Sequence, residues 1–250
     1  MNILYCAFGQ PGAFILDKIV SNKNINDKIF CITYDTQENL KLIDKLKTYE
    51  IKYSLLSINN QELIDEIINF APKIIISIYF RNLISRNILE LALLGGINLH
   101  PSLLPKYRGA FSCPWSIINN EKVTGITYHY MNEKFDDGKI ILQKPVNIEN
   151  SDTAFSLYNK LINTAVNSFN IVYDLVVNKK YKGTFQEGKV SYYPREVPFN
   201  GYIDKNWNNN KIERYIRAMN FPGKPYAKLL EGNKEIEIRN MKQYLSLIEK

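Results

Sequence analysis

The sequence has little of what builds disulfide scaffolds or cysteine-rich metal centres. Its three cysteines, Cys6, Cys31 and Cys113, are spread over 250 residues without the spacing of a metal-binding motif. Isolated cysteines of this kind indicate a reducing compartment rather than a secreted protein. Because Cys6 and Cys31 lie within apolar runs, we expect both to be small buried side chains, and we expect no bound metal.

Long apolar runs and targeting signals are also missing. No apolar stretch reaches the roughly 20 residues that a membrane-spanning helix needs. The first residues enter an apolar run directly, without the basic segment and cleavage site of a signal peptide. We therefore expect a cytoplasmic protein that does not associate with a membrane.

An excess of one charge sign is present but small. The chain has 32 Lys and Arg against 25 Asp and Glu, a formal net charge of +7, with 45% hydrophobic and 12% aromatic residues. The composition is that of an ordinary globular protein. The positive charge would also suit a noncatalytic RNA-binding protein. Against this alternative, the basic residues are scattered and form no stripe interleaved with aromatic residues. Small anionic ligands fit the charge better than nucleic acid.

The glycine-rich loops of nucleotide-binding enzymes are incomplete. The segment FGQPGA, residues 8–13, follows the first predicted strand. It lacks the third glycine of a dinucleotide fingerprint and the Gly-Lys-Ser/Thr of a nucleotide hydrolase. The segment is either a plain turn from strand to helix or a substrate contact.

The first hundred residues alternate short apolar runs with longer amphipathic runs, which is typical of βαβ units. Runs that are apolar throughout, such as 74–79, predict a parallel sheet covered on both faces. We expect an α/β, Rossmann-like, mostly parallel sheet with helices on both faces. Its expected strands are 2–8, 28–34, 51–55, 74–79 and 97–100, and its expected helices are 13–20, 38–49, 62–70 and 83–93.

The pattern changes after residue 100. Two strands are expected at 123–131 and 139–146, and a long helix at 153–177 with Ser151 or Asp152 as its N-cap. After residue 180 the sequence is rich in Gly, Pro, Asn and Tyr, with a short helix expected at 211–219 and strands at 226–230 and 235–239. We predict a catalytic domain, 1–182, and a small C-terminal appendage, 183–250, with a helix and a β-hairpin that contributes to substrate binding or dimerisation.

Two polar side chains stand out on the strand that ends at residue 100. Asn98 and His100 share one face of that strand because alternate residues point the same way. Ligands of open α/β sheets bind at the carboxyl ends of the strands, and an irregular basic loop follows here. A hydrogen-bonded structural pair is the alternative. The later sequence Asp136-Asp137-Gly138, taken alone, is an ordinary hairpin turn.

Together these segments resemble a known family. They are Asn98-x-His100-Pro-Ser-Leu-Leu-Pro-x-Tyr-Arg-Gly, then Trp115-Ser-Ile, Thr124-Gly-Ile-Thr-Tyr-His129 and Asp136-x-Gly. Their order and spacing resemble the formyltetrahydrofolate-dependent formyltransferases, most closely over residues 95–146. Because several separated segments occur in the right order, the resemblance is more specific than any single motif.

The resemblance implies that Asn98, His100 and Asp136 are catalytic and that N10-formyltetrahydrofolate is the cosubstrate. An amine attacks the formyl carbon and gives a tetrahedral intermediate with negative charge on oxygen, which the Asn98 amide and the His100 imidazole can stabilise. Asp136 can orient the imidazole and help relay protons. Either His100 or Asp136 takes the first proton.

The resemblance also implies that the pterin lies against two loops. Its expected contacts are Phe80, Arg81, Leu83 and Ile84 in one loop and Lys134 and Asp137 in the other. His129 is either a supporting residue or a structural histidine. Trp115 is either a core anchor or a stacking platform.

Three kinds of acceptor occur among the enzymes that the chain resembles. Glycinamide ribonucleotide transformylases resemble the catalytic domain alone and have a phosphate loop richer in glycine. Methionyl-tRNA formyltransferases continue into a C-terminal barrel for which this chain is too short. The nucleotide-linked amino-sugar N-formyltransferases have a short appendage and resemble the chain best. The expected acceptor is a dTDP-linked amino-dideoxy sugar, dTDP-4-amino-4,6-dideoxyglucose, made for O-antigen or another surface polysaccharide.

Binding such an acceptor needs cations for the diphosphate and flat apolar side chains for the base. The candidates are Lys106, Arg108 and Arg195 for the diphosphate, and Phe221 and Tyr226 for the base. By analogy with the sugar enzymes we expect a homodimer. The base, the sugar epimer and the position of the amine stay open at this stage.

Overall fold

The computed structural model describes residues 1–24 and 26–248. Contacts divide the chain into two compact units, each built from several segments. The first unit comprises Met1–His100, Thr127–Gln143 and Thr164–Gly188, and the second comprises Pro101–Ile126, Lys144–Asn163 and Lys189–Lys250. The chain passes from one unit to the other within three elements, β7 (Val123–Tyr130), β8 (Ile140–Asn147) and α6 (Ala154–Tyr173). The functional boundary at residue 182 stays a prediction.

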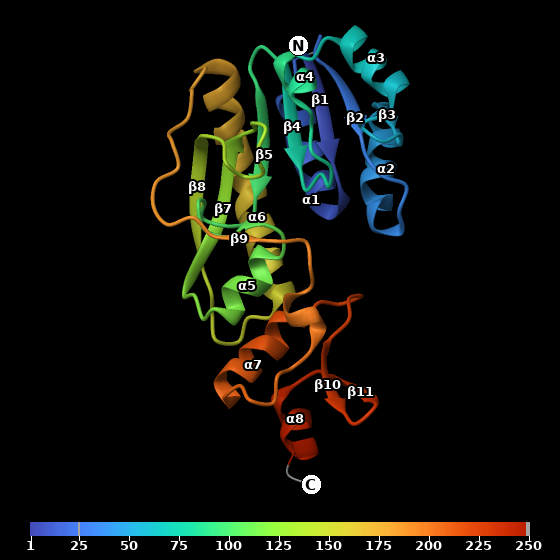
Figure 1. Ribbon diagram of the computed structural model, residues 1–250. Coiled ribbons are helices and arrows are strands. Elements are labelled where there is room, and N and C mark those ends of the chain that lie inside the picture. Colours follow the sequence, from blue (N-terminus) through green and yellow to red (C-terminus); the bar gives the residue numbers. More distant parts are fainter. Residues whose placement is uncertain (25, 249–250) are drawn as a thin grey trace. The chain divides into compact units, whose positions relative to one another are not determined.

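A seven-stranded sheet with the order β3-β2-β1-β4-β5-β7-β8 forms the centre of the first unit (Figure 1). The pairs among β1 to β5 are parallel, and β7 is antiparallel to β5. The mostly parallel sheet expected from the apolar runs is therefore confirmed. The first five strands are β1 (Asn2–Ala7), β2 (Lys28–Ile32), β3 (Lys52–Ser54), β4 (Ile74–Ile78) and β5 (Gly96–His100).

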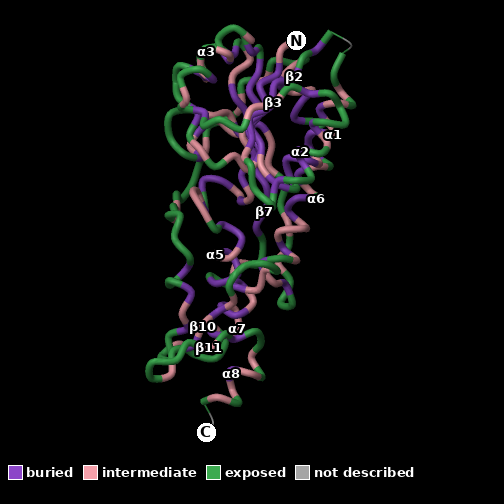
Figure 2. The backbone as a smooth tube through the Cα atoms, turned by 90° about the vertical axis from the view of Figure 1, so that its right-hand side faces the viewer, coloured by how far each residue is buried: buried purple, intermediate pink, exposed green. Residues whose placement is uncertain are grey.

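Helices cover both faces of this sheet. Leu4 and Cys6 of β1 belong to an apolar cluster with α3 (Gln61–Phe70) and α4 (Arg86–Glu90). Tyr5 points to the other face, where its hydroxyl donates to the carbonyl oxygen of Gly12 in α1 (Gly9–Asn22) at 2.6 Å. A short turn η1 (Gln37–Asn39) leads into α2 (Leu40–Thr48), which lies beside α1. Most residues of β1, β2, β4, β5 and β7 are buried, and the tube in Figure 2 is purple over much of this sheet.

Two helices begin later than the sequence predicts. Ser85 has extended dihedral angles (φ −63°, ψ 156°), so α4 begins at Arg86 and leaves residues 83–85 in the loop. The N-cap of α6 is neither Ser151 nor Asp152. Thr153 takes that role, because its hydroxyl oxygen accepts the backbone N–H of Ser156 at 3.2 Å. A short turn η2 (Asp174–Asn178) follows the end of α6.

The second unit contains small elements. A helix and a hairpin are present after residue 183, as the sequence predicts, and α8 is an additional helix that it does not predict. Asn208 caps α7 by accepting the N–H of Lys211, at 2.9 Å. The elements are β6 (Arg108–Gly109), α5 (Ser112–Ile118), β9 (Tyr192–Tyr193), η3 (Pro198–Gly201), α7 (Asn209–Ala218), β10 (Ala227–Glu231), β11 (Lys234–Ile238) and α8 (Met241–Ile248).

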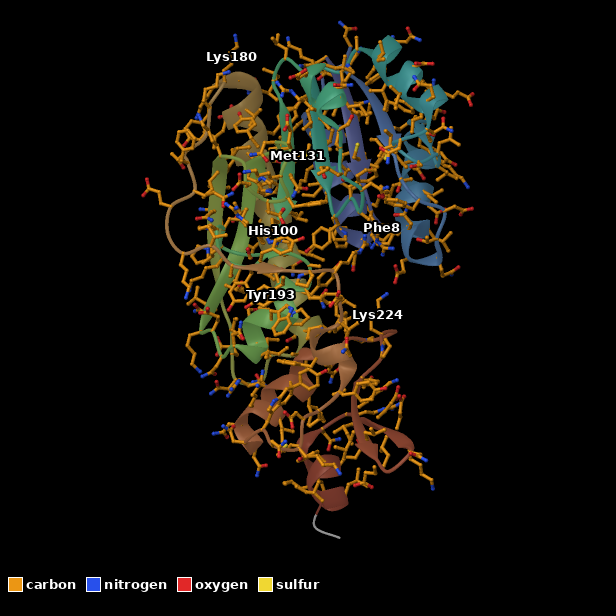
Figure 3. All side chains as sticks on the ribbon, viewed as in Figure 1. Phe8, His100, Met131, Lys180, Tyr193 and Lys224 are labelled. Carbon is orange, nitrogen blue, oxygen red and sulfur yellow. The ribbon has the colours of Figure 1, made fainter. Side chains whose placement is uncertain are left out.

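Strand register decides which residues meet at the edge of the sheet. In β5 and β7, Asn98 lies opposite His129 and His100 lies opposite Thr127. His100 is labelled at the lower end of β5 in Figure 3, and Met131 lies near the other end of the strand.

No helix within the described residues is long and apolar enough to cross a membrane.

Candidate active site

A row of polar side chains runs across three neighbouring strands of the first unit. Ser77 of β4 is in register with Asn98 of β5, and Asn98 is in register with His129 of β7. The row continues to Cys6 of β1, which faces the apolar cluster under α3 and α4. The three polar residues thus share one face of the sheet.

The side-chain amide of Asn98 is bonded at both ends. Its Oδ1 accepts the hydroxyl of Ser77 at 2.8 Å. Its Nδ2 lies 3.1 Å from Nε2 of His129 and 3.5 Å from Oδ1 of Asp136. The contact with Asp136 is long for a hydrogen bond, so that N–H is the one that a ligand can most easily redirect.

The surroundings of His129 select one tautomer of its ring. Nδ1 lies 2.8 Å from the carbonyl oxygen of Tyr130, which can only accept a hydrogen bond. Nδ1 therefore carries a proton, and in this tautomer of the neutral ring Nε2 accepts from Asn98. His129 is 2% exposed and lies in contact with Asn98 and Asp136. The sequence predicts it only as a supporting or structural histidine.

His100 and Asp136 form a buried pair at the carboxyl end of β5. Nδ1 of His100 lies 3.3 Å from Oδ2 of Asp136, and the two residues are 4% and 9% exposed. Oδ1 of the same carboxylate lies 3.5 Å from Nε2 of His129. A buried carboxylate at this position orients the imidazole and stabilises the positive charge that the ring gains when it takes a proton.

The turn that carries Asp136 is held in an unusual backbone conformation. Asp136 has a φ of 53°, in the left-handed region that few residues other than glycine adopt. Gly138 is required for space, because a Cβ there would lie 1.7 Å from the carbonyl oxygen of Tyr130. The side-chain amide of Gln186 donates to the carbonyl oxygens of Asp136 and Gly138, at 2.7 and 2.9 Å. The turn is therefore held both by the space that only Gly138 leaves and by the hydrogen bonds from Gln186.

The first loop expected to hold the pterin follows β4. Arg81 pairs with Glu38 at 2.9 Å, and its guanidinium lies 3.7 Å from the ring centroid of Phe8. Phe80 packs against the ring of Tyr34, with the centroids 5.2 Å apart. Burial raises the pKa of Tyr34 to about 12, so its hydroxyl remains a neutral donor. In the same loop Leu83 is exposed and Ile84 is buried.

The second expected loop connects β7 with β8. Lys134 is exposed there, and its backbone N–H bonds to Oδ1 of Asn132 at 3.0 Å. Asp137 is half-buried beside Asp136. Because β5 lies between β4 and β7, the two loops follow strands on either side of the one that carries Asn98 and His100.

The cationic side chains expected to bind the diphosphate of the acceptor all lie in the second unit. Lys106 is exposed and pairs with Glu121 at 3.4 Å. Arg108 belongs to β6, which pairs with β9, and Arg195 follows β9 as an exposed residue. These strands bring the segments of Arg108 and Arg195 near each other.

The two aromatic candidates lie between α7 and β10. Phe221 is half-buried and meets the rings of Phe155 and Tyr158 edge to face, with both centroid separations 5.3 Å. Tyr226 lies under the guanidinium of Arg239, 4.8 Å from the ring centroid. The binding roles of these residues remain predictions.

Trp115 belongs to an aromatic stack of the second unit. Its ring stacks on Tyr193 with the centroids 4.6 Å apart, and Tyr193 stacks on Tyr107 at 5.4 Å. Phe199 meets Trp115 edge to face at 5.3 Å. These contacts favour the core anchor over the stacking platform for Trp115.

Two residues of the site are missing from the sequence interpretation. Ser77 gives a weak signal, since it is the one polar residue of the apolar strand 74–78. Gln186 gives none, because it lies in a polar segment far along the chain from the turn that it holds. Cys6 and Cys31 are buried, as the sequence predicts, and Cys113 is buried as well. Burial raises the pKa of each thiol, so each stays protonated. Among the described residues, no three His, Cys, Asp or Glu side chains gather as metal ligands.

Comparisons with known sequences match this chain to formyltransferases. The sequence model of the family described as formyl transferase matches residues 26–172. A protein of Brucella melitensis named GDP-perosamine N-formyltransferase is 39% identical over 247 residues, which are 98% of this chain and 95% of that protein.

Two solved structures share the fold. A sugar N-formyltransferase from a Shewanella species superposes with a TM-score of 0.80 at 21% identity, over 96% of each chain. An N-formyltransferase from Helicobacter canadensis, in complex with folinic acid and dTDP-3-aminofucose, superposes with a TM-score of 0.74 at 23% identity, over 94% of this chain and 85% of that one. From the family match and the Brucella relative, we conclude that this chain is an enzyme that belongs to the formyl transferase family.

Proposed function

We propose that the protein transfers a formyl group from N10-formyltetrahydrofolate to the amine of a nucleotide-linked 4-amino-4,6-dideoxyhexose. The observation that carries the proposal is the buried contact of 3.3 Å between His100 and Asp136, beside the amide of Asn98. A donor amide, an imidazole and a carboxylate meet here at the carboxyl end of a parallel strand. This is the set that acyl transfer to an amine requires.

The chain's own groups supply two functions in this reaction. Nδ2 of Asn98 and the ring of His100 donate to the oxygen of the formyl group as it becomes negative, which typically contributes about 10²- to 10³-fold for one donor. The amine must lose a proton and N10 of the folate must gain one. The His100–Asp136 pair moves that proton, with Asp136 stabilising the charged ring.

The positions of the two expected pterin loops support the folate donor. They follow β4 and β7, the strands that flank β5, and Asp136 of the second loop contacts both His100 and Asn98. The Helicobacter protein, which shares the fold, forms a complex with folinic acid, a folate derivative. We assign the segments 80–84 and 134–137 of this chain to the donor.

The relatives support a sugar nucleotide as the acceptor. The Brucella protein is named for GDP-perosamine, and perosamine is a 4-amino-4,6-dideoxyhexose. Its similarity over nearly the whole of both chains favours a sugar acceptor over glycinamide ribonucleotide or Met-tRNA. Among sugar nucleotides it ranks GDP-perosamine ahead of dTDP-4-amino-4,6-dideoxyglucose, the acceptor that the sequence predicts. The product would enter O-antigen or another surface polysaccharide.

We assign acceptor binding to residues of the second unit. Lys106, Arg108 and Arg195 would meet the diphosphate, and Phe221 and Tyr226 the base. The segment 183–250 would then serve the acceptor or a homodimer contact, in a cytoplasmic enzyme that uses no metal.

An acceptor panel tests the proposal. The purified protein is incubated with N10-formyltetrahydrofolate and, separately, with GDP-perosamine, dTDP-4-amino-4,6-dideoxyglucose, a dTDP-3-amino sugar, glycinamide ribonucleotide and Met-tRNA. Mass spectrometry measures the gain of one formyl group. We expect formylation of a 4-amino sugar nucleotide. Formylation of glycinamide ribonucleotide or Met-tRNA with none on the sugars would overturn the proposal, and formylation of only the 3-amino sugar would overturn the assigned amine position.

A further inference from the structure

We propose that Ser77 is a positioning residue that anchors the side-chain amide of Asn98 with its N–H groups towards Asp136, an inference that rests on the proposed function. Ser77 lies on β4, one strand away from Asn98, and is 4% exposed. Its hydroxyl lies 2.8 Å from Oδ1 of Asn98. It acts on the reaction only through Asn98.

The amide of an asparagine can turn over, and its neighbours decide which end points where. In the neutral ring of His129, Nε2 is an acceptor, because Nδ1 donates to the carbonyl oxygen of Tyr130. The carboxylate of Asp136 is also an acceptor. Turning the amide over would place Oδ1 of Asn98 against both. The orientation with Nδ2 towards His129 and Asp136 is therefore the one that the surroundings allow.

This orientation makes Ser77 the donor to Oδ1. A hydroxyl can donate or accept, but only donation suits an amide oxygen. Within the described part of the chain, Oδ1 of Asn98 has no other hydrogen-bond donor. Removal of the Ser77 hydroxyl takes the donor away from this oxygen at a partly buried site. The amide then loses the anchor at one of its two ends.

The hydrogen bond from Ser77 fixes the direction of the Asn98 N–H group that points to Asp136. That contact is 3.5 Å long, so the N–H is available to the oxygen of the formyl group as it becomes negative. A hydrogen bond donated to the amide oxygen also polarises the amide, which strengthens the N–H groups as donors. Ser77 therefore acts on the transition state and leaves the binding of donor and acceptor unchanged.

Kinetics of Ser77 variants test the proposal. We expect Ser77→Ala to lower kcat by about tenfold, the scale of one hydrogen bond, with both KM values unchanged. Ser77→Thr keeps the hydroxyl and should retain most of the activity. Ser168→Ala is the matched control, because that buried hydroxyl donates to the carbonyl oxygen of Thr164 at 2.7 Å, within α6. It should lose some stability and no activity.

A double-mutant cycle separates positioning from general damage. In the Asn98→Ala background, Ser77→Ala should have no further effect on kcat/KM, because the amide that it anchors is gone. An equal loss in both backgrounds, or a Ser77→Ala enzyme within about twofold of the wild type, would overturn the proposal. Thermal melting of each variant checks the fold.

The ring of His129 gives a readout that needs no activity. The chain has two histidines, so a ¹⁵N spectrum of the labelled protein contains two rings, and His100→Gln assigns them. We expect Nδ1 of His129 to carry the proton, and we expect Nε2 to be bare and to shift in Ser77→Ala as its bond from Asn98 loosens. A proton on Nε2, or no shift in Ser77→Ala, would refute the orientation. If the wild type formylates no sugar nucleotide, the proposed function fails while this spectrum still decides the hydrogen-bond arrangement.

Discussion

The side-chain amide of Gln186 donates to the main-chain carbonyl oxygen of Asp136 at 2.7 Å, across 50 residues of sequence. The same amide reaches the carbonyl oxygen of Gly138 at 2.9 Å. Both bonds hold main chain on either side of Asp137, so Gln186 keeps the Asp136 turn in its left-handed conformation. The carboxylate that faces His100 is thus fixed from a segment beyond α6.

Gln186→Ala should lower kcat by about tenfold, the effect of freeing two hydrogen bonds at a strained turn. Gln186→Glu should be worse, because its carboxylate would face two carbonyl oxygens. Steady-state kinetics measure both variants. Gln61→Ala is the control, since that exposed amide bonds only within α3, to Asp65 at 2.9 Å. Equal activity for Gln186→Ala and Gln61→Ala would contradict the role given to Gln186.

Gly138→Ala tests the space at the same turn. The new Cβ would meet the carbonyl oxygen of Tyr130 at 1.7 Å, so the turn must shift, at a cost of about 3 kcal/mol or more in the free energy of unfolding. Gly232→Ala is the control, because nothing lies within 4 Å there and only its φ of 57° opposes a side chain, at a cost of about 1 kcal/mol. Urea unfolding measures both. A Gly138→Ala protein as stable as Gly232→Ala would show that the turn adapts.

His100→Ala and Asp136→Ala test the proposed proton relay. Each should lower kcat by about 10³-fold, since proton transfer by a positioned side chain contributes on that scale. The double variant should be little worse than either single one, because the two residues act as a unit. Near-wild-type turnover in either single variant, with an unchanged circular dichroism spectrum, would remove that residue from the mechanism.

Asp152 should make stability depend on pH. Burial opposes its ionisation, but bonds from Lys160, Ser156 and the N–H of Glu149 together hold its pKa below the ordinary 3.8. A lowered pKa in the folded state stabilises the protein above the unfolded value and loses that contribution as pH falls through the folded one. We expect Asp152→Asn to cost about 2 kcal/mol at pH 7 and progressively less below pH 3.8.

Thermal melting between pH 7 and the acid range measures this difference. Asp174→Asn is the control, because the pKa of Asp174 is lowered in the same direction by bonds from Asn178 and Lys179 but its side chain is 44% exposed. It should leave the melting temperature almost unchanged at every pH. A gap between wild type and Asp152→Asn that stays constant into acid would contradict the assignment.

The sequence predicts the strands of the first unit well, because short runs that are apolar throughout are typical of strands buried on both faces of a sheet. The alternation along β5 is enough to place Asn98 and His100 on one face. It does not reveal Ser77, because the partner of a polar side chain on β4 depends on the register of two strands, and register is a property of the folded sheet. Gln186 depends on a contact across the fold, which no local pattern records.

Helix ends are harder to predict than the strands. Ser151, Asp152 and Thr153 are all good N-cap residues, and local sequence does not rank them. The carboxylate of Asp152 accepts hydrogen bonds from Lys160 and from the N–H of Glu149, so Thr153 caps the helix instead. The same holds for 83–85, where apolar spacing continues but Ser85 is extended and the helix begins only at Arg86. Packing and competing hydrogen bonds decide such cases.

The pairing of His100 with Thr127 has a consequence for how such an enzyme can diversify. The chain leaves the first unit after His100 and re-enters it at Thr127, and these residues lie opposite each other on neighbouring strands. The segment 101–126 is thus an excursion whose two ends are clamped by the sheet itself. Residues 101–122 of this segment precede β7, so we expect changes there to leave His100 in place on β5. Under the proposed function, Lys106 and Arg108 bind the acceptor from this segment, so its exchange is expected to change acceptor specificity while β5 keeps His100 in place.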